Sequence, residues 1–304
     1  MRHHEIEKRV ASIMAGTPRG GSASLPFLGT VACVMGHRLR AVSLPCSACV
    51  LVLRGRKTVF LGSESMVARE GDMFLLPAQC EVSIENVPDP AEGRYLALCL
   101  SFGADMVARV AAGLDTGEPL GGFSLDSLRV VFDVPLLASL GHLLDMAAFC
   151  PGEERLLGLS LEAFLTLAAA RTSCMPALSR AEASWRTRLA RLVLADPSRD
   201  WSVAGMAARL GVSERTLRRN LHAERTAFRE VLRDVRLGAA LAQLQAGRSN
   251  VAEVALGCGY GSPSRFAVLF RERFGVRPSD IGRFMAGNGQ HLAGLERTGM
   301  GAAG

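Results

Sequence analysis

The chain has 304 residues, enough to bury two hydrophobic cores, and its 49% hydrophobic content is sufficient to fill them. No stretch reaches the ~18 to 20 uninterrupted apolar residues of a membrane-spanning helix, and no apolar secretory segment follows the amino terminus. Composition therefore argues against an integral membrane protein and favours a cytoplasmic protein of two domains.

Charge is distributed unevenly along the chain. Residues 185–284 contain 18 Arg and no Lys against 9 acidic residues, a net charge of +9, whereas residues 1–184 have a net charge of −3. A basic domain joined to a mildly acidic one indicates a polyanionic partner for the first and sensing or self-association for the second.

Cysteine and histidine usage gives no sign of a metal or cofactor. The 8 Cys are scattered among hydrophobic neighbours, so buried thiols are expected. Cys46 and Cys49 form one C-x-x-C, but neither Cys33 nor Cys80 supplies the second ligand pair of a structural zinc site. Of the dispersed His residues, only His37 falls within the strand-rich segment, where one His more often has a structural role. We therefore expect neither metal nor cofactor.

The first part of the chain changes from a flexible composition to a strand-like one. Residues 1–24 end in a Gly/Ser/Pro-rich run and are predicted to be a mobile arm. From about residue 25, short apolar runs between turn residues predict a small β-barrel or sandwich. The expected strands are Cys49–Leu53, Thr58–Leu61, Met73–Leu76, Glu81–Ile84 and Tyr95–Phe102. A hairpin turn should carry the basic residues Arg54, Arg56 and Lys57 into solvent, the alternative being a grip on an anionic effector.

Helical periodicity follows the strands. Residues 136–147 and 156–170 predict two amphipathic helices, which either cover the barrel or form a dimer interface. The segment Thr172–Pro176 is expected to end a first domain of residues 25–175. A lead helix, Trp185–Leu194, then opens a second domain.

The segment Trp201–Arg283 contains one pattern twice. In the first copy, apolar residues at i, i+3, i+4 and i+7 predict a short helix that ends at Gly211, and Ser213 caps a second helix. In the second copy, Gly259 and Ser262 take these places. The apolar positions are Val203, Met206, Ala207 and Leu210, then Val251, Val254, Ala255 and Cys258. A helix over Phe228–Gln245 is expected to separate two helix-turn-helix units.

This part of the chain resembles the AraC/XylS family of bacterial transcription regulators. The matching residues are Arg236–Leu237, Ala240, Leu244, Val251–Ala255, Gly259–Tyr260, Phe266, Phe270, Phe274–Gly275 and Pro278. The resemblance implies that residues 180–285 form a DNA-binding domain of two helix-turn-helix units joined by a linker helix. Ile281, Ala267 and Val268 depart from the family pattern, which weakens the expectation that the second unit contacts bases.

The strand-rich segment is similar to the cupin-like sensor domain of many regulators of this family. The residues that carry this similarity are Leu53–Lys57, Leu61–Gly62, Gly71–Asp72, Leu76–Pro77 and Tyr95–Leu98. The predicted fold is therefore α+β in two domains, an N-terminal cupin-like β-barrel with flanking helices and a C-terminal all-α double helix-turn-helix. Residues 286–304, rich in Gly and Ala, are predicted to be a disordered tail.

Contacts with DNA are expected at the two recognition helices. The predicted DNA-binding residues are Ser213, Arg215, Arg218, Arg219, Ser262, Ser264 and Arg265. Arg271 and Arg273 are expected either to contact phosphate or to keep the helix soluble. Glu214 is expected to favour the helix N-terminus, with a cytosine contact as the alternative.

The sequence predicts a regulator and no enzyme. The glycines of Gly257–Ser262 follow a helix-period segment and not a buried strand, so they serve a turn and not a phosphate loop. The family resemblance implies a sequence-specific regulator of promoter DNA, more often an activator that contacts RNA polymerase. We expect a homodimer controlled through its N-terminal domain by a small molecule or a partner protein. The alternative is alkyl-transfer chemistry at a metal-held Cys, among positions 33, 46, 49 and 80.

Overall fold

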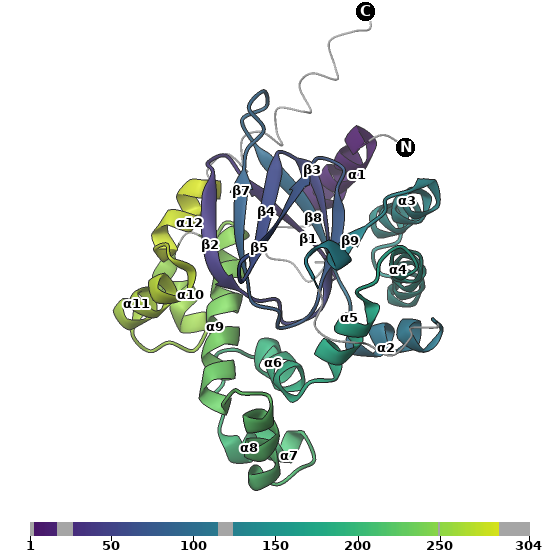
Figure 1. Cartoon of the computed structure of the whole chain (residues 1–304). Helices are drawn as coiled ribbons and strands as arrows, with labels where there is room; N and C mark the ends of the chain where they lie inside the picture. Colours follow the sequence, from purple (N-terminus) through teal and green to yellow (C-terminus); the bar gives the residue numbers. More distant parts are fainter. Residues whose placement is uncertain (1–2, 17–26, 115–123, 249, 286–304) are drawn as a thin grey trace, which may run out of the picture.

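The computed structural model describes residues 3–16, 27–114, 124–248 and 250–285. Two antiparallel sheets with flanking helices make up the N-terminal part, and helices alone make up the C-terminal part (Figure 1). This is the α+β architecture that the periodicity predicts. None of the described helices is both long and apolar enough to cross a membrane.

The two sheets share one hydrophobic core. The five-stranded sheet has the order β1-β8-β3-β6-β9 and the four-stranded sheet the order β2-β7-β4-β5. The strands are β1 (Leu28–Cys33), β2 (His37–Val42), β3 (Ala48–Arg54), β4 (Arg56–Leu61), β5 (Glu64–Arg69), β6 (Met73–Leu76), β7 (Val82–Val87), β8 (Tyr95–Ser101) and β9 (Arg129–Val130).

Burial explains which strands the sequence revealed. Central β3 is apolar and buried along almost its whole length, so its sequence is a continuous hydrophobic run. Edge strands β2 and β5 alternate buried and exposed residues, and β1 is only half-buried. These three strands were not predicted, because Arg in β2, Glu and Arg in β5 and Gly in β1 interrupt the apolar pattern of their sequences. The other long strands agree with prediction to within a few residues.

The helices of the N-terminal part lie beside the five-stranded sheet, with α3 and α4 packed against each other (Figure 1). Helices α3 and α4 agree with the two predicted amphipathic helices, whereas α2 and the short 3-10 turn η1 were not foreseen. The bounds are α2 (Ala104–Ala112), η1 (Asp126–Leu128), α3 (Val134–Phe149), α4 (Glu154–Ala169) and α5 (Met175–Ala183).

Two predictions about the ends of the first domain need correction. Residues 3–16 form helix α1 (His3–Gly16) and not a mobile arm, because Ile6, Val10 and Ile13 are buried against the domain. The rest of the predicted arm lies outside the described residues. Helix α5 begins inside the predicted boundary, at Met175, and packs on α2, so we propose that the N-terminal domain extends to Ser184, the N-cap of the next helix.

The predicted basic hairpin tip is also different in the structure. Gly55 turns the chain between β3 and β4, but Arg54 forms ion pairs with Glu7, Glu70 and Glu92. Lys57 is buried between the sheets, since it follows the turn by two residues and its side chain points inward. Only Arg56 is exposed as expected.

The C-terminal part contains seven helices within the described residues. They are α6 (Trp185–Ala195), α7 (Val203–Arg209), α8 (Glu214–Ala223), α9 (Phe228–Gln245), α10 (Val251–Gly257), α11 (Pro263–Phe274) and α12 (Pro278–Met285). The linker helix α9 has the predicted bounds. Helices α10 to α12 lie beside β2, whereas α7 and α8 lie away from the sheets (Figure 1). The predicted tail, residues 286–304, lies outside the described residues.

Candidate nucleic-acid interface

The repeat predicted from the sequence has matching backbone geometry. In the first turn the amide of Val212 donates to the carbonyl of Ala207 at 3.0 Å, and in the second the amide of Tyr260 donates to the carbonyl of Ala255 at 3.0 Å. The second turn is one residue longer, because α11 begins one position later relative to its preceding helix. The two units are therefore copies of one helix-turn-helix.

Each turn depends on a glycine in the left-handed region. Gly211 has φ 68° and Gly259 has φ 79°. A Cβ on Gly259 would lie 2.8 Å from the carbonyl oxygen of Pro197 and from the guanidinium of Arg236, whereas one on Gly211 would meet nothing within 4 Å. Both turns need the conformational freedom of Gly, and the second also needs the missing side chain.

The predicted serines begin the two recognition helices. Ser213 Oγ accepts the amide of Thr216 at 3.1 Å, and Ser262 Oγ accepts the amide of Arg265 at 3.3 Å. An N-cap of this kind satisfies one free helix amide. The Ser213 hydroxyl also lies 2.9 Å from the hydroxyl of Thr216, within hydrogen-bond distance. Both helix N-termini are exposed, so each also presents a partial positive charge to an approaching anion.

Helix α8 presents a basic face to solvent. Leu217 and Leu221 are buried, which turns Arg215, Arg218 and Arg219 outward, and all three are exposed. The carboxylate of Glu214 lies 3.3 Å from the guanidinium of Arg218, one helical turn away. Glu214 therefore pairs with Arg218 in addition to its place at the helix N-terminus.

Helix α11 presents a less basic face. Its buried residues are Phe266, Phe270 and Phe274, so Ser264 and Arg265 are exposed together with Val268, which is 57% exposed. The two outer faces are therefore chemically unequal.

One of the two outer arginines of α11 is already engaged. Arg271 is exposed, but the Arg273 side chain is only 16% exposed and its guanidinium lies 2.8 Å from Glu81 and 3.6 Å from Asp234. The expectation that Arg273 contacts phosphate or solvent is wrong. It connects the second unit to the N-terminal sheet instead.

Asp234 on the linker helix is a residue that the sequence reasoning missed. Its side chain is 8% exposed, and its carboxylate accepts a hydrogen bond from Arg186 at 3.2 Å besides lying near Arg273. Arg186 also donates to Gln79 of the N-terminal domain at 3.1 Å. An acidic residue next to Val235 on the buried face of α9 was the available signal, because a buried carboxylate needs a cationic partner.

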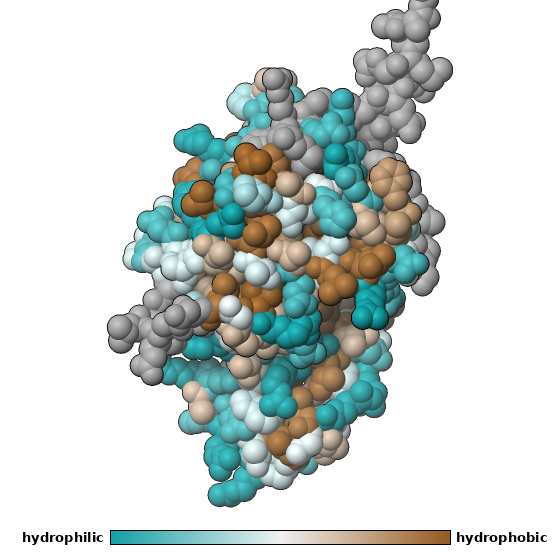
Figure 2. All heavy atoms as spheres, turned by 90° about the vertical axis from the view of Figure 1, so that its right-hand side faces the viewer, coloured by the Kyte–Doolittle hydropathy of each residue, from teal (hydrophilic) through white to brown (hydrophobic). Residues whose placement is uncertain are grey.

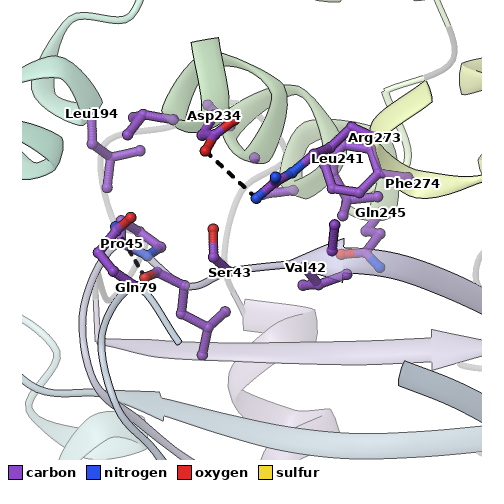
Figure 3. A pocket seen from close by; sticks show the side chains of 16 residues that line it. Val42, Ser43, Pro45, Gln79, Leu194, Asp234, Leu241, Gln245, Arg273 and Phe274 are labelled. Atoms are coloured by element: carbon purple, nitrogen blue, oxygen red, sulfur yellow. Dashed lines mark hydrogen bonds and ion pairs between the residues drawn. The ribbon is translucent and has the colours of Figure 1, made fainter. Parts of the chain in front are cut away.

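A small pocket lies between the two parts of the chain (Figure 3). Its volume is about 130 Å³, and its walls are mostly apolar, with Asp234 and Arg273 at one side. The loop after β2, the helices α6 and α9 and the end of α11 line it; the labelled residues are Val42, Ser43, Pro45, Gln79, Leu194, Asp234, Leu241, Gln245, Arg273 and Phe274.

The thiols proposed for the alternative chemistry are in environments that disfavour the thiolate. Burial raises the pKa of Cys33 to about 12 and of Cys80 to about 11, and it also raises the pKa values of Cys46 and Cys49. Within the described ranges, no three His, Cys, Asp or Glu side chains gather as metal ligands would.

Comparison with known proteins supports the reading of the repeat. A family model described as "Helix-turn-helix domain" matches residues 206–283. The chain is 33% identical over 100 residues to the transcriptional regulator SirC of Salmonella typhimurium (strain SL1344). The matched region covers 33% of this chain and 34% of SirC. It is 33% identical over 93 residues to the urease operon transcriptional activator of Escherichia coli, 31% of each chain. The chain thus matches about a third of the length of these relatives, which are regulators and not enzymes.

Solved structures show a similar fold over most of the chain. ToxT from Vibrio cholerae strain SCE256, with an unsaturated fatty acid bound, covers 86% of this chain and 95% of its own, with a TM-score of 0.56 and 15% sequence identity. ToxT from Vibrio cholerae O395, bound to (E)-4-(8-methylnaphthalen-1-yl)but-3-enoic acid, has a TM-score of 0.58, 13% identity and coverage of 84% and 97%. The two-domain fold, β-rich and then helical, is therefore shared.

Proposed function

Since the chain carries a double helix-turn-helix domain of the AraC/XylS type, we propose that it is a sequence-specific DNA-binding regulator of transcription. The observation that carries this is the outward face of α8, where Arg215, Arg218 and Arg219 are exposed on the second helix of a helix-turn-helix. That helix is the one that enters the major groove in such motifs. The cytoplasm, where bacterial promoters are found, is its proposed site of action.

Genome-wide mapping of the bound sites, followed by gel-shift titration of one recovered duplex, tests this function. The double variant Arg215→Ala/Arg218→Ala should bind that duplex at least tenfold more weakly. Arg283→Ala is the matched control, because Arg283 is 78% exposed but lies on α12, which is neither of the two recognition helices. A full-length chain that binds random and recovered duplexes equally would contradict the proposal.

We propose the seven residues predicted from the sequence as the DNA contacts. Ser213 and Ser262 would donate their hydroxyl hydrogens to phosphate at the helix N-termini, and Arg215, Arg218 and Arg219 would reach base edges or phosphate. Ser264 and Arg265 are the corresponding residues of the second unit, whose apolar Val268 favours phosphate contact over base reading.

Control by a small molecule in the N-terminal domain is the second part of the proposal. One of the ToxT structures has an unsaturated fatty acid bound, and the pocket between the domains of this chain is mostly apolar with Arg273 at its edge. A cavity of about 130 Å³ holds a group about as large as benzene, so a longer chain requires the domains to separate slightly. Thermal shifts with a series of fatty acids test this, and a concentration-dependent rise in melting temperature is expected. If no member of the series raises it, a regulatory protein is the remaining candidate.

Self-association is proposed through α4. After the charged first turn, Glu154 and Arg155, its exposed residues form an uncharged stripe, with Leu156 and Leu159 toward one end and Ala163 and Thr166 toward the other. An antiparallel pairing with a second copy would set large side chains against small ones. Figure 2 views the molecule from the side of α3 and α4 and shows hydrophobic residues at this surface.

Light scattering on the purified chain tests the dimer. Leu159→Glu should yield a monomer, because it places two carboxylates in the paired surface. Met35→Glu is the control, since Met35 is also exposed, at 51%, but lies outside the stripe. A dimer that survives Leu159→Glu would mean that another surface associates.

Activation through RNA polymerase is the proposed direction of regulation. One relative is named as a transcriptional activator, and this supports activation over repression. Transcription in vitro from a recovered promoter, with and without the protein, decides the sign.

A further inference from the structure

The two helix-turn-helix units have different relations to the N-terminal domain. Among the described residues, the first unit has a core of its own, formed by α6, α7, α8 and the first half of α9. The second unit has no separate core. Its Phe266, Phe270 and Phe274 belong to the same continuous hydrophobic cluster as the two sheets. The second unit thus shares its core with the N-terminal domain, whereas the first unit does not.

The contact runs through β2, the edge strand of the four-stranded sheet. Helix α11 packs on β2, and α12 packs on β1. The amide of Val34, in the turn between β1 and β2, donates to the carbonyl of Phe284 at 2.8 Å. The ring of His37 stacks on the ring of Phe284, with 4.5 Å between centroids and 4° between planes.

A chain of buried hydrogen bonds fixes the His37 ring from behind. Lys57 Nζ donates to Asn86 Oδ1 at 2.6 Å, and this orients the amide so that its Nδ2 donates to His37 Nε2 at 3.4 Å. His37 Nε2 must then be the unprotonated nitrogen, so Nδ1 donates to the carbonyl of Met35 at 3.0 Å. Each group has one possible orientation once Lys57 is an ammonium.

Lys57 is an unusual group to find at the start of such a chain. It is 4% exposed, and no Asp or Glu lies within ion-pair distance of it in the described part of the molecule. Among the residues that the structure describes, Asn86 accepts its hydrogen bond, and the phenol oxygen of neighbouring Tyr95 is buried without a hydrogen-bond partner. A buried cation without a counter-charge costs several kcal/mol, so its surroundings respond strongly to any change in its charge or contacts.

We propose that the N-terminal domain acts on DNA binding through the second helix-turn-helix unit, along the path Lys57, Asn86, His37 and Phe284. The path begins between the sheets and ends on α12, whose position sets that of α11. Helices α7 and α8 lie off this path, and the first unit meets the N-terminal domain elsewhere, where Arg186 of α6 donates to Gln79. The part of this inference that concerns DNA rests on the proposed function, whereas the coupling itself does not.

Hydrogen exchange of the full-length chain, resolved by peptide, tests the coupling without DNA. The key variant is Asn86→Asp, which gives Lys57 a carboxylate but removes the donor to His37. It should raise exchange in residues 278–285 and in β2 at least tenfold and leave α7 and α8 within twofold of the parent chain. Phe284→Leu, which keeps an apolar contact but removes the stack, should give the same pattern.

Met66→Ala is the control, because Met66 is buried in the same core but is not on the path. It should raise exchange in the sheets and leave exchange in residues 278–285 as it is in the parent chain. Unchanged exchange in residues 278–285 of Asn86→Asp would overturn the path. An equal rise in α7 and α8, or an equal effect of Met66→Ala on residues 278–285, would also overturn it.

Footprinting on a duplex recovered with the full-length chain then tests the consequence for DNA. Asn86→Asp should weaken protection of the segment under Arg265 at least fivefold and leave the segment under Arg215 unchanged. Equal weakening of both segments would refute control through the second unit. If the parent chain protects no duplex, the proposed function fails, but the exchange result still decides whether the path exists.

Discussion

The guanidinium of Arg273, on the second recognition helix, lies 2.8 Å from the carboxylate of Glu81, just before β7 of the N-terminal sheet. The same guanidinium lies 3.6 Å from Asp234 on the linker helix, which also accepts from Arg186. One arginine thus joins the second helix-turn-helix unit, the linker helix and the N-terminal domain. Asp234 is the buried centre of this network, whereas the Glu81 side chain is 50% exposed.

This difference in burial predicts different effects of two substitutions. Glu81→Gln should lower the free energy of unfolding by less than about 1 kcal/mol, because solvent screens a half-exposed pair. Asp234→Ala should lower it by roughly 3 kcal/mol, because it leaves two guanidinium groups without their buried partner. Urea unfolding of both variants measures the difference. Equal losses would mean that Asp234 is not the centre of the network.

The two turn glycines predict a graded cost. Gly211→Ala should lower the free energy of unfolding by about 1 kcal/mol, the cost of a left-handed alanine. Gly259→Ala should cost at least about twice as much, because its Cβ would also meet the Pro197 carbonyl at 2.8 Å. The comparison uses thermal unfolding of the full-length chain, and each variant serves as the other's control. A larger loss for Gly211→Ala would contradict the packing of the second turn.

Lys57 predicts a dependence of stability on pH. Burial lowers the pKa of Lys57 from its ordinary 10.5 to about 8. Between pH 8 and 10.5 the unfolded chain holds a proton that the folded chain has lost, so this group's destabilisation disappears as the pH rises. The parent chain should therefore gain roughly 3 kcal/mol of unfolding free energy over this range relative to Lys57→Met. A constant difference between the two proteins from pH 7 to pH 10.5 would show that Lys57 is not held as a buried cation.

Single substitutions on α8 predict how DNA is read. Arg218→Ala or Arg219→Ala should cost about 1–3 kcal/mol of binding free energy, with relaxed preference at one base pair, if the side chain contacts a base. If it contacts phosphate, binding to all DNA sequences should weaken alike and the salt dependence of binding should become flatter. Titration at several salt concentrations separates the two. Unchanged affinity and salt slope in both variants would mean that α8 is not the recognition helix.

The linker predicts the size of the footprint. Helix α9 has 18 residues and so spans about 27 Å, which with the width of the flanking helices sets the recognition helices about one DNA turn, ~34 Å, apart. One protomer should protect two successive major-groove segments on one face of the duplex. The segment under α8 should show the stronger base preference, since α11 exposes Val268 where a polar residue would read. A footprint of one segment per protomer would refute the predicted spacing. Equal base preference in the segments under α8 and α11 would refute the stronger base reading by α8.

Local patterns were sufficient to predict the repeat and its linker. The spacing of Val203 to Leu210 and of Val251 to Cys258, the two capping serines and the two turn glycines depend on residues within a turn or two of each other. Such contacts are local, so the sequence alone predicts them. The same holds for strands such as β3 and β6, which are buried on both faces and therefore have continuous apolar sequences.

The tertiary structure alone decided which residues of distant segments meet. Lys57 lies two residues after a turn, a position typical of an exposed lysine. Only the packing of the two sheets places it beside Asn86. Arg273 has the spacing of a solvated arginine, and only the docking of α11 on β2 brings it to Glu81. Helix α1 has a weak apolar pattern and becomes ordered because the domain buries Ile6 and Val10. In each case the partner is remote in sequence, and long-range burial overrides the local preference for solvent.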